Sequence, residues 1–188
     1  MPRAGLSTDR VVDEAAALAD EIGLENLTMA EIAKRLHVRL PSLYKHVAGM
    51  PALRRQLAIR AKSELAGVLA RATVGRARSD ALRALGLAYR EWALAHPGGY
   101  SASVRAPFPG DAEDEEASAA NVQIVFDVLA GYGLSDDALV DATRSLRAGL
   151  HGFMLLERAG AFALDRAPED SFSWMIDSLD TAMASTTP

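Results

Sequence analysis

Four polar side chains lie within five consecutive positions of the sequence, in the segment Ser42-Leu-Tyr-Lys-His46. They offer a hydroxyl, a phenol, an ammonium and an imidazole group, all able to donate hydrogen bonds. A short helix that exposes them could enter a major groove of DNA and bond to phosphate oxygens and base edges. The alternative is that Tyr44 and His46 only cap a small hydrophobic core.

The charge around this segment has one sign. The chain as a whole carries a net charge of −5, yet the stretch from Ile32 to Ser63 has no acidic residue. Such a run is commonly a solvated helix face, so it indicates phosphate binding only together with a motif. Its basic residues are Lys34, Arg35, Arg39, Lys45, Arg54, Arg55, Arg60 and Lys62.

The sequence offers little for other kinds of chemistry. It has no cysteine, which excludes disulfides, thiolate metal sites and a cysteine nucleophile. It also has no glycine-rich phosphate loop, nucleophile elbow or paired His-Glu metal motif. His96 and His151 could share a metal ion, but no carboxylate stands at a suitable spacing. We expect no catalytic residue, no metal site and no cofactor, and keep an all-helical enzyme as the main alternative.

The spacing of apolar residues predicts helices on both sides of the segment 42–46. It predicts a first helix over residues 8–22, ended by Gly23. Thr28 and Glu31 form a capping box, which predicts a second helix that ends near Leu36. Both helices have an apolar face that can pack on a common core.

Proline and glycine residues mark where the next two helices begin and end. After a turn over residues 37–40, Pro41 suits a first helical turn, so we expect a short third helix over 41–47. A long fourth helix opens at Pro51 and ends before Gly75. Two short helices joined by a tight turn make a helix-turn-helix inside a three-helix cluster.

The segment from Leu27 to Val47 resembles the DNA-binding segment of the TetR family of bacterial repressors. Ile32-Ala-Lys-Arg-Leu36 matches the family's Ile-Ala-x-x-Leu pattern, and Ser42-Leu-Tyr-Lys-His-Val47 matches its recognition helix. The resemblance covers roughly residues 8 to 60. It implies an all-α fold, with a three-helix DNA-binding domain followed by a larger helical domain for ligand binding and dimerisation.

The resemblance also implies roles for individual residues. Tyr44 and His46 are expected to bond backbone phosphates, and Lys45 a phosphate or a base. Thr28 lies at a helix N-terminus, whose amides favour another phosphate. The residues expected to contact double-stranded DNA are Thr28, Arg39, Leu40, Pro41, Ser42, Tyr44, Lys45 and His46.

The sequence departs from the family pattern at three positions. His37 stands where glycine is common, because a left-handed backbone is favoured there. Leu40 replaces a residue that is often polar, and would either contact a thymine methyl group or lengthen the hydrophobic anchor. Met50 replaces a basic residue, for which Arg54 and Arg55 could substitute. A dimeric ligand-binding module that has lost DNA binding is therefore a second alternative.

The rest of the chain is expected to bind a small molecule. We predict a DNA-binding domain over residues 1–50 and a regulatory domain over 51–188. A helix toward His96 should end at Pro97-Gly-Gly99, with a loop after it, and the acidic run 111–116 should be a solvated helix start. The candidate ligand-binding residues, for each of which core packing is the commoner role, are Tyr89, Trp92, His96, Tyr100, Phe126, His151 and Met154.

Two amphipathic helices are predicted at the end of the sequence, the first capped by Ser135-Asp-Asp137 and the second opening at Pro168. Pairing with their copies would bury their apolar faces in a four-helix bundle. Residues 145–162 also resemble a subclass of TetR-like C-terminal domains with a Leu-His-Gly-Phe signature. The expected homodimer interface consists of Leu146, Leu150, Phe153, Phe172, Met175, Ile176 and Leu179.

These inferences combine into one hypothesis. The chain is expected to be a homodimeric transcriptional regulator that represses from a palindromic operator and is released by a small-molecule effector. No apolar run approaches the roughly 20 residues that cross a bilayer, and the N-terminus lacks the apolar stretch of a signal peptide. We therefore expect a soluble, cytoplasmic protein without a membrane partner.

Overall fold

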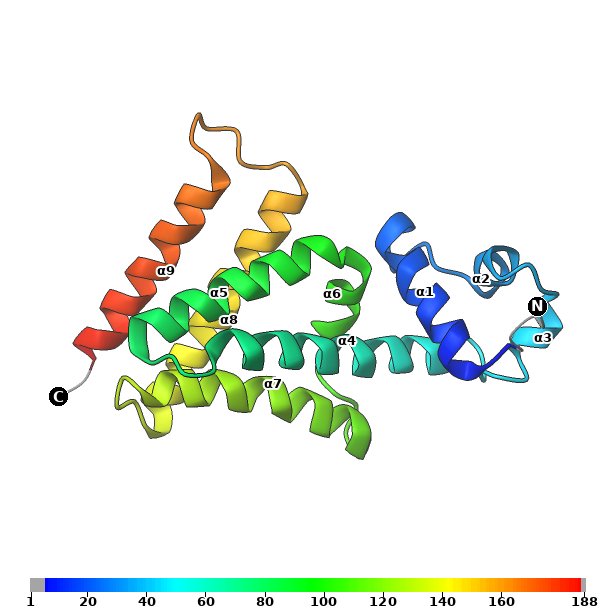
Figure 1. Cartoon of the computed structure of the whole chain (residues 1–188), viewed down its shortest axis with the longest axis horizontal. Coiled ribbons are helices and arrows are strands. Elements are labelled where there is room, and N and C mark those ends of the chain that lie inside the picture. Colours follow the sequence, from blue (N-terminus) through cyan, green and yellow to red (C-terminus); the bar gives the residue numbers. More distant parts are fainter. Residues whose placement is uncertain (1–5, 187–188) are drawn as a thin grey trace. The chain divides into compact units, whose positions relative to one another are not determined.

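The computed structural model describes residues 6–186, and every helix or strand assigned within that range is an α-helix (Figure 1). This confirms the all-α prediction. The helices are α1 (Thr8–Ile22), α2 (Met29–Arg35), α3 (Leu40–Leu43), α4 (Met50–Thr73), α5 (Arg78–Ala95), α6 (Pro97–Ser103), α7 (Ala112–Ala130), α8 (Asp136–Arg158) and α9 (Pro168–Ser185).

The described residues form two compact units. The first combines residues 6–63 with His96–Ser118, and the second combines Glu64–Ala95 with residues 119–186. Helices α4 and α7 each run from one unit into the other. The predicted functional division between residues 50 and 51 falls at the start of α4 and stays a prediction.

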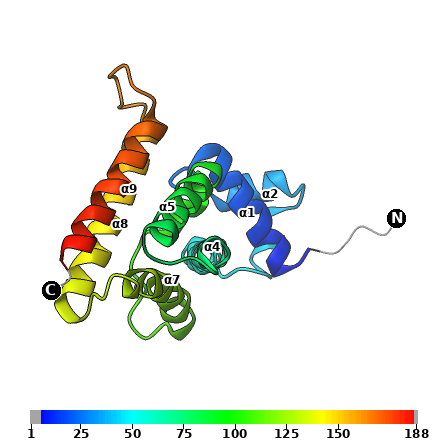
Figure 2. The same ribbon diagram turned by 60° about the vertical axis from the view of Figure 1, so that its left-hand side comes forward.

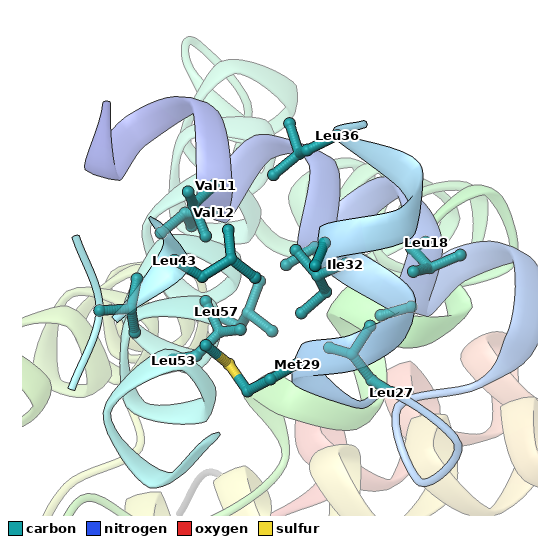
Figure 3. Close-up of a cluster of buried hydrophobic side chains, with 14 of the residues drawn as sticks. Val11, Val12, Leu18, Leu27, Met29, Ile32, Leu36, Leu43, Leu53 and Leu57 are labelled. Carbon is teal, nitrogen blue, oxygen red and sulfur yellow. The ribbon is translucent and has the colours of Figure 1, made fainter. Parts of the chain in front are cut away.

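The core of the first unit joins α1, α2, α3 and the beginning of α4 (Figure 3). Val11, Ile32, Leu43 and Leu53 are completely buried, one from each of these helices. Burying a side chain of this size stabilises the fold by about 1.5–3 kcal/mol. The short helices α2 and α3 are therefore held by shared packing rather than by their own length.

The tight turn between α2 and α3 has the backbone that the sequence predicted. Thr28 caps α2, its Oγ accepting a hydrogen bond from Glu31 N at 3.2 Å. The expected return bond of the capping box is replaced by a contact of the Glu31 carboxylate with Lys34 Nζ at 3.8 Å. His37 adopts a φ of 54°, in the left-handed region, and Arg39 is extended before α3 begins.

The third helix is shorter than the predicted range of 41–47. It covers Leu40–Leu43, and the following residues continue as a turn. His46 N and Val47 N both donate to Leu43 O, at 2.9 and 3.0 Å. This shared acceptor tightens the chain, which lets the buried Leu43 and Val47 both reach the core.

The prediction that a helix ends at Pro97-Gly-Gly99 is confirmed, because α5 stops at Ala95, but the loop predicted after it is wrong for residues 101–103, which belong to a new helix, α6. Pro97 is the first residue of α6, where its fixed φ suits a helix and its missing N–H is not needed. Gly98 has a separate role: a Cβ there would lie 2.3 Å from the carbonyl carbon of Ala19 in α1. Gly98 thus permits close packing of α6 on α1.

The second unit is built around α5, α8 and α9, with α8 and α9 lying side by side as an antiparallel pair (Figures 1 and 2). Gly86 lets α5 approach α9, since a Cβ there would meet Ile176 Cδ1 at 2.7 Å. Arg90 of α5 forms ion pairs with Glu157 of α8 and Glu169 of α9. These contacts join all three helices.

The predicted boundaries in the second unit are confirmed with one correction. Helix α7 ends before Gly131, and α8 and α9 begin near Ser135 and at Pro168 as expected. The Ser135 hydroxyl, however, makes no capping hydrogen bond. Across the described part of the chain, none of the helices combines the length and apolar character needed to cross a membrane.

Candidate nucleic-acid interface

The exposed surface of α3 is set by two inward anchors. Leu43 is fully buried and Val47 nearly so, which turns the residues between and before them outward. Tyr44 keeps 55% of its surface exposed and Leu40 keeps 37%. Three of the other residues predicted to contact DNA around α3 are exposed, namely Arg39, Pro41 and Lys45. The remaining two, Ser42 and His46, are half-buried.

The position of Leu40 bears on the two roles predicted for it. It is the first residue of α3 and lies outside the hydrophobic cluster of the first unit. This position favours the predicted contact with an apolar group over a role in the buried anchor. Its side chain is free to contact an apolar group of a ligand, such as a thymine methyl.

Helix α1 fixes the turn that follows α3. The Thr8 hydroxyl, at the first residue of α1, donates a hydrogen bond to His46 O at 3.2 Å. This bond joins two segments that are 38 residues apart in sequence. It holds the backbone carrying Tyr44, Lys45 and His46 in one orientation relative to α1.

Thr28 can serve two partners at once. Its oxygen accepts the capping bond from Glu31 N, and a hydroxyl still has a hydrogen to donate. The residue is exposed at the N-terminus of α2. Its capping role in the fold is therefore compatible with the predicted contact to a phosphate.

The basic run from Lys34 to Lys62 separates into paired and unpaired cations. Arg35 binds Glu21 through two hydrogen bonds of 2.6 and 2.7 Å, which lower the pKa of the Glu21 carboxyl. Arg60 pairs with Asp13 of α1. Arg39 and Lys45, by contrast, have no ion pair or side-chain hydrogen bond with any residue of the described range 6–186.

Arg55 belongs to the paired group. Its guanidinium binds Asp111 at 2.5 and 2.6 Å and Glu113 at 2.8 Å. The hydrogen bond from Arg55 lowers the pKa of the Asp111 carboxyl. The suggestion that Arg55 replaces the missing cation at Met50 is therefore not supported, and Arg54 is itself engaged with Leu24 O at 3.3 Å.

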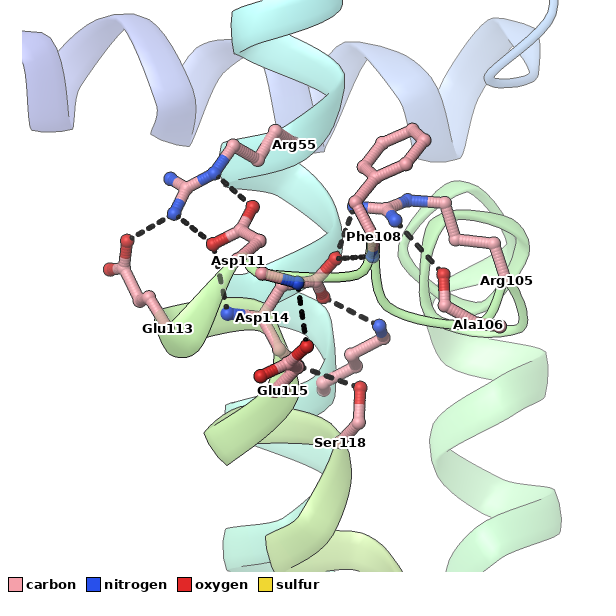
Figure 4. A network of polar contacts seen from close by, with 11 residues as sticks. Arg55, Arg105, Ala106, Phe108, Asp111, Glu113, Asp114, Glu115 and Ser118 are labelled. Carbon is pink, nitrogen blue, oxygen red and sulfur yellow. Dashed lines mark hydrogen bonds and ion pairs between the residues drawn. The ribbon is translucent and has the colours of Figure 1, made fainter.

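The prediction of a solvated acidic run is wrong for Asp114. This carboxylate is completely buried, binds Lys62 Nζ at 2.6 Å and Arg105 at 2.8 Å, and accepts from Phe108 N at 3.4 Å (Figure 4). Burial raises the pKa of Asp114, but the hydrogen bond and charge of Lys62 outweigh it and leave the pKa lowered. The sequence did hold a sign that one carboxylate would be buried: Lys62 lies on the apolar face of α4, between Ala58 and Leu65, and a buried cation needs an anionic partner.

The predicted ligand-binding residues are divided between the two units. His96 and Tyr100 lie in the first, where His96 Nδ1 is 3.4 Å from Asp20 Oδ2 and Tyr100 is buried. In the second unit, Trp92 and Met154 are buried, and Tyr89, Phe126 and His151 are half-buried. Among the residues from 6 to 186, no three potential metal-ligating side chains come together.

The predicted interface residues also differ in burial. Leu146, Leu150, Phe172 and Ile176 are already buried inside a single chain, so they support α8 and α9 from within. Phe153, Met175 and Leu179 are half-buried. Larger exposed apolar surfaces on these two helices belong to residues that the sequence did not single out, namely Val140, Leu155, Leu156 and Trp174.

Two family models match this chain. The model described as bacterial regulatory proteins, tetR family, matches residues 11–57. The model of the tetracyclin repressor-like C-terminal domain matches residues 82–179. The first match spans α1 to the beginning of α4, and the second spans most of the helices of the second unit.

Curated relatives agree with these matches. The chain is 35% identical over 176 residues to the uncharacterised HTH-type transcriptional regulator YobS of Bacillus subtilis, covering 93% of this chain and 91% of that protein. It is 39% identical over 160 residues to the uncharacterised HTH-type transcriptional regulator Rv0681 of Mycobacterium tuberculosis, covering 84% of this chain and 72% of that protein.

Solved structures share the fold at lower identity. A Rhodococcus protein of unknown function superposes with a TM-score of 0.78 at 22% identity, covering 98% of this chain and 99% of the other. A TetR variant of Acinetobacter baumannii in complex with minocycline superposes with a TM-score of 0.72 at 24% identity, covering 95% and 96% of the two chains. The arrangement of helices along the whole chain is therefore one that known proteins adopt.

Proposed function

The chain belongs to the TetR family of bacterial regulatory proteins, and we propose that it is a homodimeric repressor that leaves a palindromic operator when a small molecule binds its C-terminal domain. Membership of this family makes it a helix-turn-helix transcriptional regulator. The sign of regulation, the operator symmetry, the dimer and the effector are the parts that we propose.

One observation carries the DNA-binding part of the proposal. Of the cations in the first helices, Arg39 and Lys45 beside α3 have no partner among residues 6–186, whereas Arg35, Arg55 and Arg60 are paired with carboxylates. Unpaired cations can neutralise phosphates without first breaking an ion pair. The proposed contact surface is therefore α3 and its following turn, with Thr28 beside it.

The dimer is supported by exposed apolar groups on α8 and α9. Leu155 and Leu156 on α8 are about half exposed, and Trp174 on α9 is 68% exposed. Apolar side chains of this size gain free energy when a second surface removes them from water. A second copy of this chain is the proposed partner, because a two-fold dimer presents two α3 helices to a palindrome.

The effector is proposed to be a small organic molecule bound in the second unit. Tyr89, Phe126 and His151 are half-buried there, and offer two aromatic rings and an imidazole. Trp92 and Met154 are buried and could form the floor of such a site, while His96 and Tyr100 stay candidates in the first unit. The minocycline-bound relative supports the class of ligand and not its identity.

The two alternatives find less support. The two curated relatives named above are regulators, which does not favour an all-helical enzyme. Arg39 and Lys45, which have no partner among residues 6–186, lie beside the exposed Tyr44, and this grouping supports DNA binding over a ligand-binding module without it.

The proposal is tested by selecting genomic fragments with the purified protein and comparing variants on the recovered duplex. Tyr44→Ala and Lys45→Ala are expected to lose the site, while Arg76→Ala, which removes one charge from the exposed loop after α4, is expected to keep it. Recovery of one palindromic site supports the regulator. Failure to recover any site, or equal binding by all variants, would contradict it.

A further inference from the structure

The first residue of α3 exposes an apolar side chain among polar neighbours. Leu40 keeps 37% of its surface exposed, and it neither belongs to the hydrophobic cluster of the first unit nor packs against it. Leu43 is fully buried and anchors the helix without it. A single exposed leucine is common on protein surfaces and indicates nothing by itself. What gives Leu40 a meaning is its place on the surface proposed to bind DNA.

The backbone puts Leu40 at the leading end of α3. His37 has a left-handed φ of 54°, and Arg39 is extended with a ψ of 140°, so the chain turns sharply and the helix begins at Leu40. In a helix-turn-helix, the N-terminal residues of the second helix contact base edges in the major groove. Leu40 is therefore among the side chains that come nearest to the bases when α3 lies in the groove.

The polar groups on both sides of Leu40 suit the phosphate backbone. Arg39 precedes it and Lys45 follows α3, and neither has an ion pair or side-chain hydrogen bond within residues 6–186. Tyr44, four positions after Leu40 and so on the same side of the chain, keeps 55% of its surface exposed. Two cations and a phenol can hold phosphates on either side, and Leu40 then faces the base edges between them.

Pro41 extends the apolar end of the helix. It is exposed, and a proline has no backbone N–H to donate. Neither Leu40 nor Pro41 has a side-chain donor or acceptor, so neither can read a base through a side-chain hydrogen bond. Ser42 is the first residue of α3 with a polar side chain, and it is half-buried.

One group of the major groove matches such an apolar surface. The edges of the unmodified bases present oxygen and nitrogen acceptors and amino donors there, and thymine alone adds an apolar group, its C5-methyl. Leucine against a donor or acceptor displaces water without replacing its hydrogen bond, which is unfavourable. Leucine against the methyl group removes the apolar surface of both from water, which is favourable. The chemistry of Leu40 thus favours a T·A pair.

We propose that Leu40 is a specificity-determining residue that reads the C5-methyl group of one thymine in each half-site of the operator. The inference rests on the proposed function, because it needs α3 to lie in a major groove. At this position the operator is recognised by a methyl group and not by a hydrogen bond. One such methyl contact contributes about fourfold to affinity, and the two half-sites of a palindrome together contribute about tenfold or more.

The experiment measures binding of the full chain to synthetic duplexes of the recovered operator at one salt concentration. Each thymine and its symmetry mate are replaced in turn by deoxyuridine, which lacks only the C5-methyl group and keeps the same hydrogen-bonding edge. At one symmetric pair of positions, this replacement should weaken binding of the native protein by about tenfold or more.

Leu40→Ala completes a double-mutant cycle with this replacement. The variant should bind the thymine duplex about tenfold more weakly than the native protein, because alanine does not reach the methyl group. Replacing the same thymines by deoxyuridine should then weaken its binding by less than about twofold. A merely structural role of Leu40 would lower binding to both duplexes and leave their ratio unchanged.

Leu87→Ala is the matched control. It makes the same truncation of an exposed leucine, but in α5 of the second unit. It should bind with native affinity and keep the native loss on deoxyuridine replacement. Because Leu40 lies outside the core, Leu40→Ala should melt at the temperature of the native protein, which verifies that weaker binding does not reflect unfolding.

The outcomes separate the reading of thymine from the function on which it rests. If the native protein binds the operator and no deoxyuridine replacement weakens binding by more than about twofold, the proposal is overturned and the regulator stands; this comparison needs no variant. If Leu40→Ala keeps the full loss, the assignment to Leu40 is overturned. If a genomic fragment binds but the synthetic duplex with unmodified cytosines does not, thymine is not the source of the methyl group. If no duplex binds, the proposed function and the inference fail together.

Discussion

Single side chains in the first unit show two ways of using charge. Lys62 and Asp114 are buried against each other and fix one segment on another, whereas Arg39 and Lys45 stay exposed beside α3. A sequence run of cations cannot reveal this division, because each pair joins residues far apart in the chain. Lys62 and Asp114 are separated by 52 positions.

The buried pair leads to a prediction for stability. Asp114→Asn leaves the charge of Lys62 in the interior without its full partner, so the free energy of unfolding at pH 7 should fall by about 3 kcal/mol. Urea unfolding followed by circular dichroism measures it. Glu116→Gln, an exposed change in the same helix, is the control and should leave the unfolding free energy within about 0.5 kcal/mol. A loss no larger than that of the control would contradict the account of the pair.

The same pair should give a pH dependence. The folded protein lowers the pKa of Asp114 below its ordinary value of 3.8, so its carboxylate stabilises the fold above that pH and loses this effect as the pH falls through the lowered pKa. The difference in unfolding free energy between native protein and Asp114→Asn should thus stay constant from pH 7 to 5 and shrink below 3.8. A difference that grows in acid would show that the sign is wrong.

At the scale of elements, sequence patterns predicted most helix boundaries but not how two segments pack. Helices α1, α8 and α9 follow apolar spacing, with Gly23 after α1 and Pro168 at the start of α9, and these signals are local. Pro97-Gly-Gly99 has the same local signals as a loop, yet it opens α6 because Gly98 meets the backbone of α1. A contact between residues this distant has no counterpart in the local sequence.

The role of Gly98 can be measured directly. Gly98→Ala places a methyl group against the backbone of Ala19 and should destabilise the protein by about 1–3 kcal/mol. Gly67→Ala in α4 meets only the flexible end of Arg71 and should be neutral or stabilising by up to about 1 kcal/mol. Thermal melting of both variants makes the comparison, and equal effects would contradict the close approach of α1 and α6.

The turn before α3 gives a further prediction. His37 has a left-handed φ of 54°, which β-branched residues strongly disfavour. His37→Val should lower the free energy of unfolding by about 1–2 kcal/mol, and His37→Gly should not lower it. Chemical unfolding of the two variants tests this. If His37→Val left the free energy of unfolding unchanged, the turn would readily adopt another backbone conformation.

At the scale of the whole molecule, the sequence shows which helices have an apolar stripe but not which side chains of the stripe stay exposed in the folded chain. The apolar stripes of α8 and α9 were visible, but a stripe does not show which part is consumed inside the chain. Leu146, Phe172 and Ile176 face inward, and the apolar surface left over lies on Leu155, Leu156 and Trp174. The split depends on α5, which packs on both helices.

The proposed dimer can be tested by charge. Trp174→Arg should shift the protein from dimer to monomer in analytical ultracentrifugation, because an arginine on a buried apolar surface loses its hydration. Leu87→Arg, on an exposed position of α5, should leave the dimer intact. A Trp174→Arg dimer of native affinity would exclude this face of α9 from the interface.

The central claim is that α3 and its following turn hold DNA through cations that have no ion-pair partner in the described part of the chain. The salt dependence of operator binding tests it most directly. Each phosphate contact contributes a slope of roughly −0.9 to log K against log salt concentration, so Lys45→Ala should reduce the slope by about 1 per subunit that contacts DNA. Arg76→Ala should leave the slope unchanged. A Lys45→Ala protein with native affinity and native slope would contradict the assignment of this surface to DNA.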